Sequence, residues 1–171
     1  FKNHPTEEVY FDLIRQKTAS LISAACELGG LTTTKSQKDC RSLRKFGMNL
    51  GMAFQIRDDL FDLYGNENLT GKDTGLDVKR NSFTLPIIHS LQTLSKKDRN
   101  SLLNIINQKN FSRNDISDLK ELIEKGNGYN YANLKIEEFT QSAIDTILYF
   151  PDSDYKNSMV NLANYNQERV Q

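Results

Sequence analysis

The stretch that decides the fold is Phe54-Gln55-Ile56-Arg57-Asp58-Asp59-Leu60-Phe61-Asp62, which lies within a long helical pattern. Its carboxylates are spaced so that Asp58 and Asp62 share one helix face and Asp59 flanks them. Like charges at this spacing repel each other and weaken a helix, and a bound cation removes that penalty. Magnesium suits the group best, because it takes oxygen ligands and shares substrate phosphates. The alternative is a solvated acidic face beside Arg57.

The helix that carries these aspartates is predicted to run from about residue 36 to residue 64. Its core stripe recurs at helical spacing and consists of Leu43, Phe46, Leu50, Phe54 and Phe61. The stripe that leads back from the acids passes through Gln55 and then through Met52, Gly51 and Met48. An acidic end followed by a flexible apolar end fits a ligand with a diphosphate head and a hydrocarbon tail. Taken one by one, the methionines are more typical of ordinary core packing.

The rest of the chain also shows helical periodicity, with short connections between the segments. A first helix is predicted to start after Thr6 as N-cap, and to end at a C-cap formed by Gly29 and Gly30. Further helices are predicted at about 83–91, 96–108, 114–126, 129–149 and 153–169, with Pro86 in the first turn of the earliest. The sequence therefore predicts seven helices, no strand, and an all-α helical bundle.

Composition narrows the function classes. A length of 171 residues predicts one domain, 1–171, and Lys+Arg 22 against Asp+Glu 22 gives no net charge, which argues against nucleic acid as a partner. No apolar run approaches the roughly 20 residues of a membrane span, so no transmembrane segment is expected. Cys26 and Cys40 form no metal motif or disulfide framework. We expect them to be free, buried or partly buried thiols in a reducing, cytoplasmic compartment.

Two further groups of residues have the chemistry to bind an anion. Lys17, followed by Thr18, interrupts the apolar stripe of the first helix, where it could meet a phosphate or simply extend its stem over the core. The segment 71–80 contains glycines and the cations Lys72, Lys79 and Arg80, which can hold an anion together with backbone donors. The alternative for that segment is an ordinary basic surface loop.

The pattern around the aspartates resembles the second aspartate-rich motif of trans-isoprenyl diphosphate synthases, the polyprenyl synthetase family. The matching residues are Gly47-x-x-x-Gly51-x-Ala53-Phe54-Gln55-Ile56-x-Asp58-Asp59-x-x-Asp62-x-x-Gly65. The likeness continues, in the right order, through Lys17-Thr18, Gly71-Lys72-x-x-Gly75-x-Asp77-Val78, Thr84-Leu85-Pro86, Gly126-x-x-x-x-Tyr131-Ala132 and Ala163-Asn164-Tyr165-x-x-x-Arg169. It covers most of the chain and is highly specific.

This resemblance implies the isoprenoid synthase fold, a homodimer and Mg²⁺-dependent prenyl transfer. An allylic prenyl diphosphate ionises, and isopentenyl diphosphate adds to the allylic cation to give a longer trans-polyprenyl diphosphate. The implied metal ligands, direct or through water, are Asp58, Asp59 and Asp62. The implied catalytic residues are Lys17, Thr18 and Gln55, and the implied substrate-binding residues are Lys17, Lys72 and Phe54.

Two departures from the family pattern leave a second hypothesis open. The family's GKxTLP lysine is Ser82 here, so that Lys79 or Arg80 would have to substitute for it. The family's first aspartate-rich motif and main isopentenyl-binding residues belong to an N-terminal half that this chain does not match. We therefore expect a C-terminal half that is inactive alone. The alternative is a non-catalytic or regulatory subunit or degenerate paralogue, and a degenerate terpene cyclase is a distant third.

Overall fold

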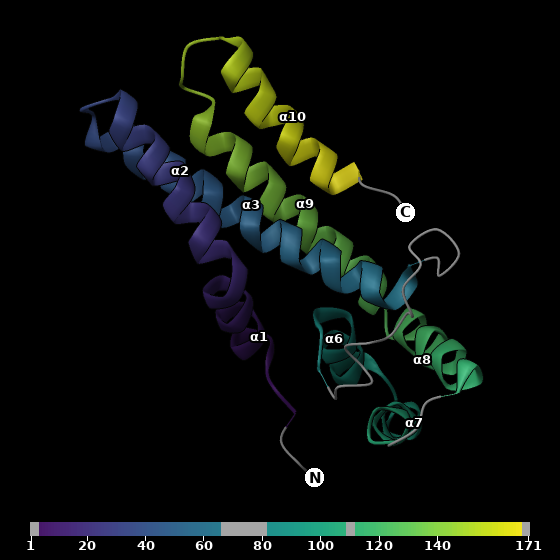
Figure 1. The fold of residues 1–171 in the computed structure, drawn as a ribbon. Coiled ribbons are helices and arrows are strands. Elements are labelled where there is room, and N and C mark those ends of the chain that lie inside the picture. The colour runs from purple at the N-terminus through teal and green to yellow at the C-terminus, as the bar shows by residue number, and fades with distance from the viewer. Residues whose placement is uncertain (1–3, 66–81, 109–111, 169–171) are drawn as a thin grey trace. The chain divides into compact units, whose positions relative to one another are not determined.

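The structure is a computed structural model that describes residues 4–65, 82–108 and 112–168, and within these ranges every regular element is a helix (Figure 1). The first run comprises α1 (Glu7–Ile14), the π-helical segment η1 (Arg15–Ala19) and α2 (Ser20–Thr33), and the long α3 (Gln37–Tyr64) follows. The later elements are α6 (Leu85–Thr93), α7 (Lys96–Ile106), α8 (Arg113–Lys125), α9 (Gly128–Ile147) and α10 (Asp154–Glu168). The predicted all-α class is confirmed.

The predicted helices and several of their ends are confirmed. Because α1, η1 and α2 follow one another without a break, the described elements form the seven predicted helical runs. The hydroxyl of Thr6 accepts from the backbone N–H of Val9 at 3.3 Å, as an N-cap does. Pro86 lies in the first turn of α6, where its missing N–H costs nothing. Both cysteines are free thiols, Cys40 buried and Cys26 half-buried.

The predicted end of the first helix at Gly29 and Gly30 is wrong. Helix α2 continues to Thr33, and neither glycine has the positive φ that a glycine C-cap uses. A Cβ on Gly30 would lie 2.7 Å from Cδ1 of Leu43 and 3.5 Å from the Cα of Cys40. Gly30 therefore serves close packing of α2 against α3 rather than termination, and the sequence pattern alone does not separate these two uses of glycine.

The chain divides into two compact units, and each is described by itself. Unit 1 comprises residues 1–10, 58–133 and 171, and unit 2 comprises residues 11–57 and 134–170. The boundaries fall inside α3 and α9, so each of these helices contributes residues to both units. That residues 1–171 form a single domain stays a prediction.

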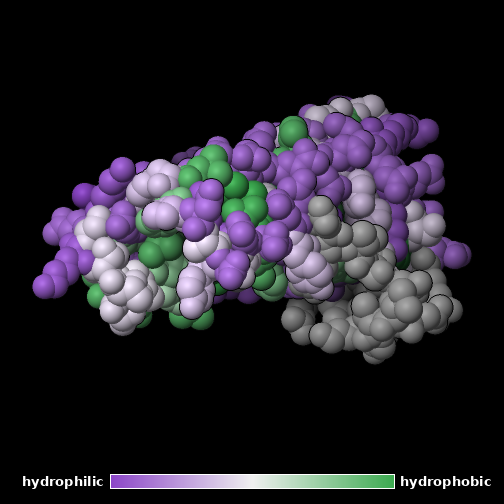
Figure 2. All heavy atoms as spheres, turned by 90° about the horizontal axis from the view of Figure 1, so that it is seen from above, coloured by the Kyte–Doolittle hydropathy of each residue, from purple (hydrophilic) through white to green (hydrophobic). Residues whose placement is uncertain are grey.

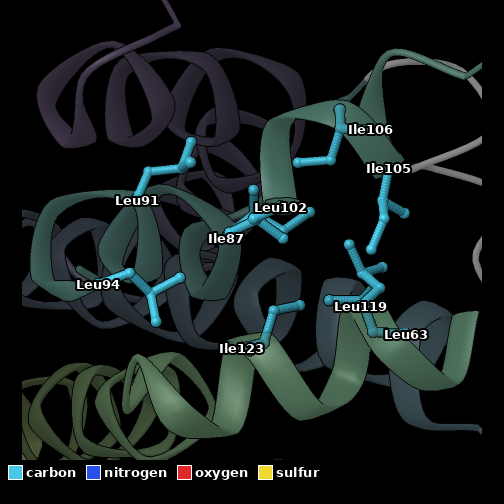
Figure 3. Close-up of a cluster of buried hydrophobic side chains, with 9 residues drawn as sticks. All are labelled: Leu63, Ile87, Leu91, Leu94, Leu102, Ile105, Ile106, Leu119 and Ile123. Carbon is cyan, nitrogen blue, oxygen red and sulfur yellow. The ribbon is translucent and has the colours of Figure 1, made fainter. Parts of the chain in front are cut away.

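Unit 1 is built around branched aliphatic side chains from α6, α7, α8 and the end of α3 (Figure 3). The three later helices contact one another pairwise. The buried cluster consists of Leu63, Ile87, Leu91, Leu94, Leu102, Ile105, Ile106, Leu119 and Ile123. Capping supports these short helices, because Ser112 and Asp115 form a reciprocal capping box at the start of α8.

Unit 2 packs α3 against the C-terminal helices on one side and against η1 and α2 on another. Phe46 and Leu50 of α3 are buried with Ala143 and Ile147 of α9 and Ala163 of α10, and these three helices lie side by side in Figure 1. The contact with η1 and α2 involves small residues, and it is described below with the site that it shapes.

The apolar stripe predicted for the first helix is only partly buried. Leu13 and Leu21 are 59% and 75% exposed, whereas Ile14 and Ala19 are buried. Helix α3 contacts the first helical run through its smaller residues, and the leucines lie away from that contact. Figure 2 shows hydrophobic side chains reaching an otherwise hydrophilic surface in several places. Among the described helices, none combines the length and the apolar character needed to cross a membrane.

Candidate functional site

The three aspartates occupy the last turns of α3, in unit 1, and their environments differ. Asp58 is exposed, Asp62 is half-buried, and Asp59 is only 6% exposed. The buried carboxylate is satisfied in part by Tyr10 of α1, whose hydroxyl donates to Oδ2 of Asp59 at 2.7 Å. A buried carboxylate without such donors would be strongly disfavoured. The aspartate pattern therefore divides into one accessible carboxylate and one that is held in place.

The donor set of this turn suits a hard divalent cation. Carboxylate oxygens are the ligands that Mg²⁺ takes, and this ion is usually held by one or two carboxylates together with water and phosphate oxygens. Within residues 4–65, 82–108 and 112–168, no group of three or more His, Cys, Asp or Glu side chains is arranged so that it could hold a metal ion. The exposed Asp58 offers an accessible oxygen beside the anchored Asp59, which fits an ion shared with an anionic ligand.

A second group of predicted site residues comes together in unit 2, on η1 and α3. The hydroxyl of Thr18 donates to Oε1 of Gln55 at 2.6 Å, and Gln55 is buried. Lys17, on the same π-helical turn, is exposed. Single π-helical turns inside α-helices occur frequently at functional sites, because the wider turn redirects side chains. The structure thus brings Thr18 and Gln55 together, although they are 37 residues apart.

Small residues on α3 bring the π-helical turn close enough for this contact. A Cβ on Gly51 would lie 2.5 Å from the Cα of Ala19, and one on Gly47 would lie 2.7 Å from the carbonyl oxygen of Ile22. Ser23 strengthens the same contact, because its buried hydroxyl donates to the carbonyl of Arg44 at 2.8 Å. The Gly47-x-x-x-Gly51 pattern therefore sets the separation of the two helices, and that separation puts Thr18 within reach of Gln55.

The remaining predicted site residues are less closely defined. Phe54, expected both in the core stripe and as a pocket wall, is 38% exposed and so is not a core residue of unit 2. Met52 is buried and Met48 half-buried. Ser82 is described and exposed. Segment 71–80, with Lys72, Lys79 and Arg80, lies outside the described residues. Its role in anion binding therefore stays a prediction.

Sequence reasoning missed Tyr10. Its position seven residues before Lys17 gave a signal, because it places an aromatic side chain with a polar tip two helical turns upstream on the same helical run. A second tyrosine makes a similar contact within unit 1, where the hydroxyl of Tyr131 on α9 donates to Oε1 of Glu7 at 2.6 Å. Both bonds tie the first turn of α1 to its neighbours.

The described elements are all helices, and an aspartate-rich turn ends the longest of them, which fits the isoprenoid synthase fold that the sequence resemblance implies. A family model described as polyprenyl synthetase matches residues 1–125. The chain therefore belongs to the polyprenyl synthetase family. It is 33% identical to a short chain isoprenyl diphosphate synthase of Methanocaldococcus jannaschii over 125 residues, which are 72% of this chain and 38% of that protein.

Other comparisons cover nearly the whole chain. A short chain isoprenyl diphosphate synthase of Methanothermobacter thermautotrophicus is 29% identical over 164 residues, or 96% of this chain and 50% of that protein. The crystal structure of geranylgeranyl pyrophosphate synthetase from Pyrococcus horikoshii matches with a TM-score of 0.90 and 28% identity, covering 99% of this chain and 51% of that one. The chain thus spans half the length of these two proteins, or slightly more.

A further solved structure combines the same fold with ligands. The polyprenyl synthase of Caulobacter crescentus, crystallised with calcium and isoprenyl diphosphate, matches with a TM-score of 0.88 and 26% identity. The match covers 96% of this chain and 50% of that protein. In that protein, the fold accompanies both a divalent cation and an isoprenyl diphosphate.

Proposed function

We propose that this chain forms part of a Mg²⁺-dependent polyprenyl diphosphate synthase. Such an enzyme transfers an allylic prenyl group to isopentenyl diphosphate and makes a longer trans-polyprenyl diphosphate. The observation that carries the proposal is the anchored aspartate turn of α3, in which Asp58 is accessible and Asp59 is held by Tyr10. A scaffold without a ligand gains nothing from such clustered carboxylates, because they repel one another.

The family resemblance gives each of the two groups its own task in this reaction, the aspartates in unit 1 and Lys17, Thr18 and Gln55 in unit 2. Magnesium, when bound, stabilises the charge of the leaving diphosphate, and the carboxylates that would hold it are Asp58, Asp59 and Asp62. The exposed ammonium of Lys17 binds the allylic diphosphate, with Lys72 as its partner in the family motif. Thr18 and Gln55 present oxygen dipoles to the allylic cation, and their mutual hydrogen bond fixes both side chains before the charge develops.

The same proposal covers the rest of the active site, the cellular compartment and the oligomeric state. The chain supplies the C-terminal half of the active site, and the additional length found in the relatives supplies the other half, including further basic residues for isopentenyl diphosphate. The two free cysteines favour the reducing environment of the cytoplasm. A homodimer is the assembly that the family resemblance implies.

A non-catalytic subunit or degenerate paralogue is the second candidate function. Ser82, which is exposed and uncharged where the family pattern has lysine, favours this alternative. An assay of the full-length protein separates the two candidates. Radiolabelled isopentenyl diphosphate and a short allylic diphosphate should give an elongated product if the protein is an enzyme, whereas a regulatory subunit should give none unless a catalytic partner is added.

The metal site has its own test, the thermal stability of the full-length protein with Mg²⁺ and inorganic pyrophosphate. A ligand that binds only the folded state stabilises it by RT ln(1 + [L]/Kd), about 2.7 kcal/mol at 100 times Kd. Asp58→Ala should abolish most of this stabilisation. Asp118→Ala serves as the matched control, because it removes an exposed aspartate from α8 of the same unit. Equal stabilisation of the two variants would mean that Asp58 belongs to a solvated acidic face.

A further inference from the structure

Tyr10 and Asp59 form a buried polar pair between the start of α1 and the end of α3. The two residues are 3% and 6% exposed, and the tyrosine hydroxyl donates to Oδ2 of the carboxylate at 2.7 Å. They are 49 positions apart in the sequence, and both belong to unit 1. A hydroxyl donor at this distance restricts rotation of the carboxylate about its last side-chain bond, because turning away would break a bond that water cannot easily replace.

Tyr10 is itself held in place by contacts at the start of α1. The side chain of Thr6 accepts from the backbone N–H of Val9, and the hydroxyl of Tyr131 donates to Glu7. These bonds fix the helical turn from which Tyr10 projects. A residue that orients another must be less free than its target, and the anchored first turn of α1 meets that condition.

We propose that Tyr10 is a positioning residue for the metal site, and that it acts by orienting the carboxylate of Asp59. This inference rests on the proposed function, in which Asp59 is one of the Mg²⁺ ligands. Groups that hydrogen-bond to metal-binding carboxylates orient them, and losing such a group typically lowers metal affinity or activity about 10- to 100-fold. Tyr10 has this geometry toward Asp59, and the sequence motif of the family resemblance does not include it.

The pair Tyr131 and Glu7 provides an internal comparison for this role. It has the same chemistry, a tyrosine hydroxyl donating to a carboxylate of unit 1 at 2.6 Å, and it also ties down the first turn of α1. It differs in that Glu7 is no part of the aspartate turn. Tyr131→Phe therefore removes an equivalent bond from the same helix without touching a candidate metal ligand.

The experiment compares Tyr10→Phe with Tyr131→Phe in the full-length protein. Both variants keep the aromatic ring, so both should fold, with a modestly lower melting temperature in the absence of ligand. The midpoint of stabilisation is then measured by titrating Mg²⁺ at a fixed concentration of inorganic pyrophosphate. We expect Tyr10→Phe to raise the Mg²⁺ midpoint on the order of tenfold. Tyr131→Phe loosens the same turn of α1 but leaves the bond to Asp59 in place, so it should change the midpoint by less than about twofold. Equal midpoints for the two variants would overturn the proposal.

A double-mutant comparison tests whether Tyr10 acts through Asp59. In an Asp59→Asn background, Tyr10→Phe should change the Mg²⁺ midpoint by less than twofold, because residues that act through one contact are not additive. A full additional tenfold change would overturn the inference. If Asp58→Ala abolishes stabilisation but Tyr10→Phe leaves the midpoint unchanged, only the role of Tyr10 fails. If the wild type shows no Mg²⁺-dependent stabilisation, the proposed metal site and the role of Tyr10 fail together.

Discussion

The two units hold their helices together in different ways. Unit 1 fills the space between α6, α7 and α8 with branched aliphatic side chains such as Ile87, Leu102 and Ile123, all fully buried (Figure 3). In unit 2, the contact of α3 with η1 relies on missing side chains, because Gly51 leaves room for the backbone of Ala19. Packing in unit 1 therefore depends on large side chains that fill space, whereas the contact in unit 2 depends on a glycine that leaves space free.

The two kinds of packing affect different properties. The aliphatic cluster mainly determines stability, and the glycine contact mainly determines the geometry of the candidate site. A close-packed aliphatic cluster stabilises its unit through buried apolar area and tolerates little loss of volume. A glycine contact contributes less area, but it lets two backbones approach each other closely, because no Cβ lies between them. In unit 2 this close approach puts Thr18 within hydrogen-bonding range of Gln55. We therefore expect unit 1 to be most sensitive to truncation and unit 2 to be most sensitive to enlargement.

The largest expected effect is truncation of the unit 1 cluster. Leu102→Ala removes a fully buried side chain from the middle of α7 and should lower the free energy of unfolding by about 2–5 kcal/mol. Leu162→Ala, at an exposed leucine of α10, should cost less than about 0.5 kcal/mol. Chemical denaturation of both variants measures the difference. Equal losses would show that the aliphatic cluster is not the main source of stability in unit 1.

Enlargement of the glycine contact should have the next largest effect. Gly51→Ala gains about 1 kcal/mol of helix propensity, but its Cβ would lie 2.5 Å from the backbone of Ala19, so one of the helices must shift. We expect the free energy of unfolding to fall by about 1–3 kcal/mol in total. The rate of the proposed prenyl transfer should also fall, because the Thr18–Gln55 bond would be stretched.

Gly29→Ala is the matched control for this substitution. Gly29 lies within α2, and an added Cβ would have no other atom within 4 Å. The control should therefore raise the free energy of unfolding by up to about 1 kcal/mol, through helix propensity alone. Equal stabilisation by the two substitutions would contradict the role given to Gly51 in unit 2. Gly51 would then be replaceable, and the separation of the two helices would have another cause.

Much of the fold could be predicted from the sequence, because helix periodicity is a local property. The 28-residue helix α3 was expected within one residue at its start, and its end at Tyr64 is confirmed. Local signals failed where tertiary contact changes the meaning of a residue. Gly30 is a residue type that is typical of helix ends, yet in the structure it allows close packing against Leu43. Leu13 follows the period of a buried stripe, yet it is exposed in unit 2.

The site could be predicted in residue type but not in arrangement. The aspartate spacing and the Lys17-Thr18 pair led to the hypothesis of a metal and phosphate site, and in the structure Thr18 contacts Gln55. The sequence did not reveal which carboxylate is buried, because helix spacing alone does not distinguish the surroundings of Asp58 from those of Asp59. The difference arises from Tyr10, whose contact with Asp59 bridges 49 positions. The π-helical turn was missed for the same reason, because it depends on the contact with α3.

The smallest expected effect is a dependence of stability on pH that originates in unit 1. Both histidines of the sequence, His4 and His89, belong to that unit. His89 is half-buried and stacks on Tyr131, with a distance of 3.9 Å between the ring centres. Burial lowers the pKa of His89 below its ordinary value, and the nearby charge of Glu7 partly opposes this shift. The folded state therefore binds a proton at His89 less readily than the unfolded state does.

The sign of the pH effect follows from this difference in proton binding. Because the unfolded state binds more protons, stability increases with pH across the window between the lowered pKa and the ordinary value near 6.5. The contribution of neutral His89 is complete above that window and is lost as the pH falls through it. His89→Gln stays neutral throughout, so the stability of the wild type relative to this variant should decrease between pH 7.5 and pH 5. The change should be small, because the imidazole is partly exposed and solvent screens it. A relative stability that rises on acidification would mean that Glu7 outweighs burial, and His89 would then be a stabilising cation of unit 1 rather than a buried neutral ring.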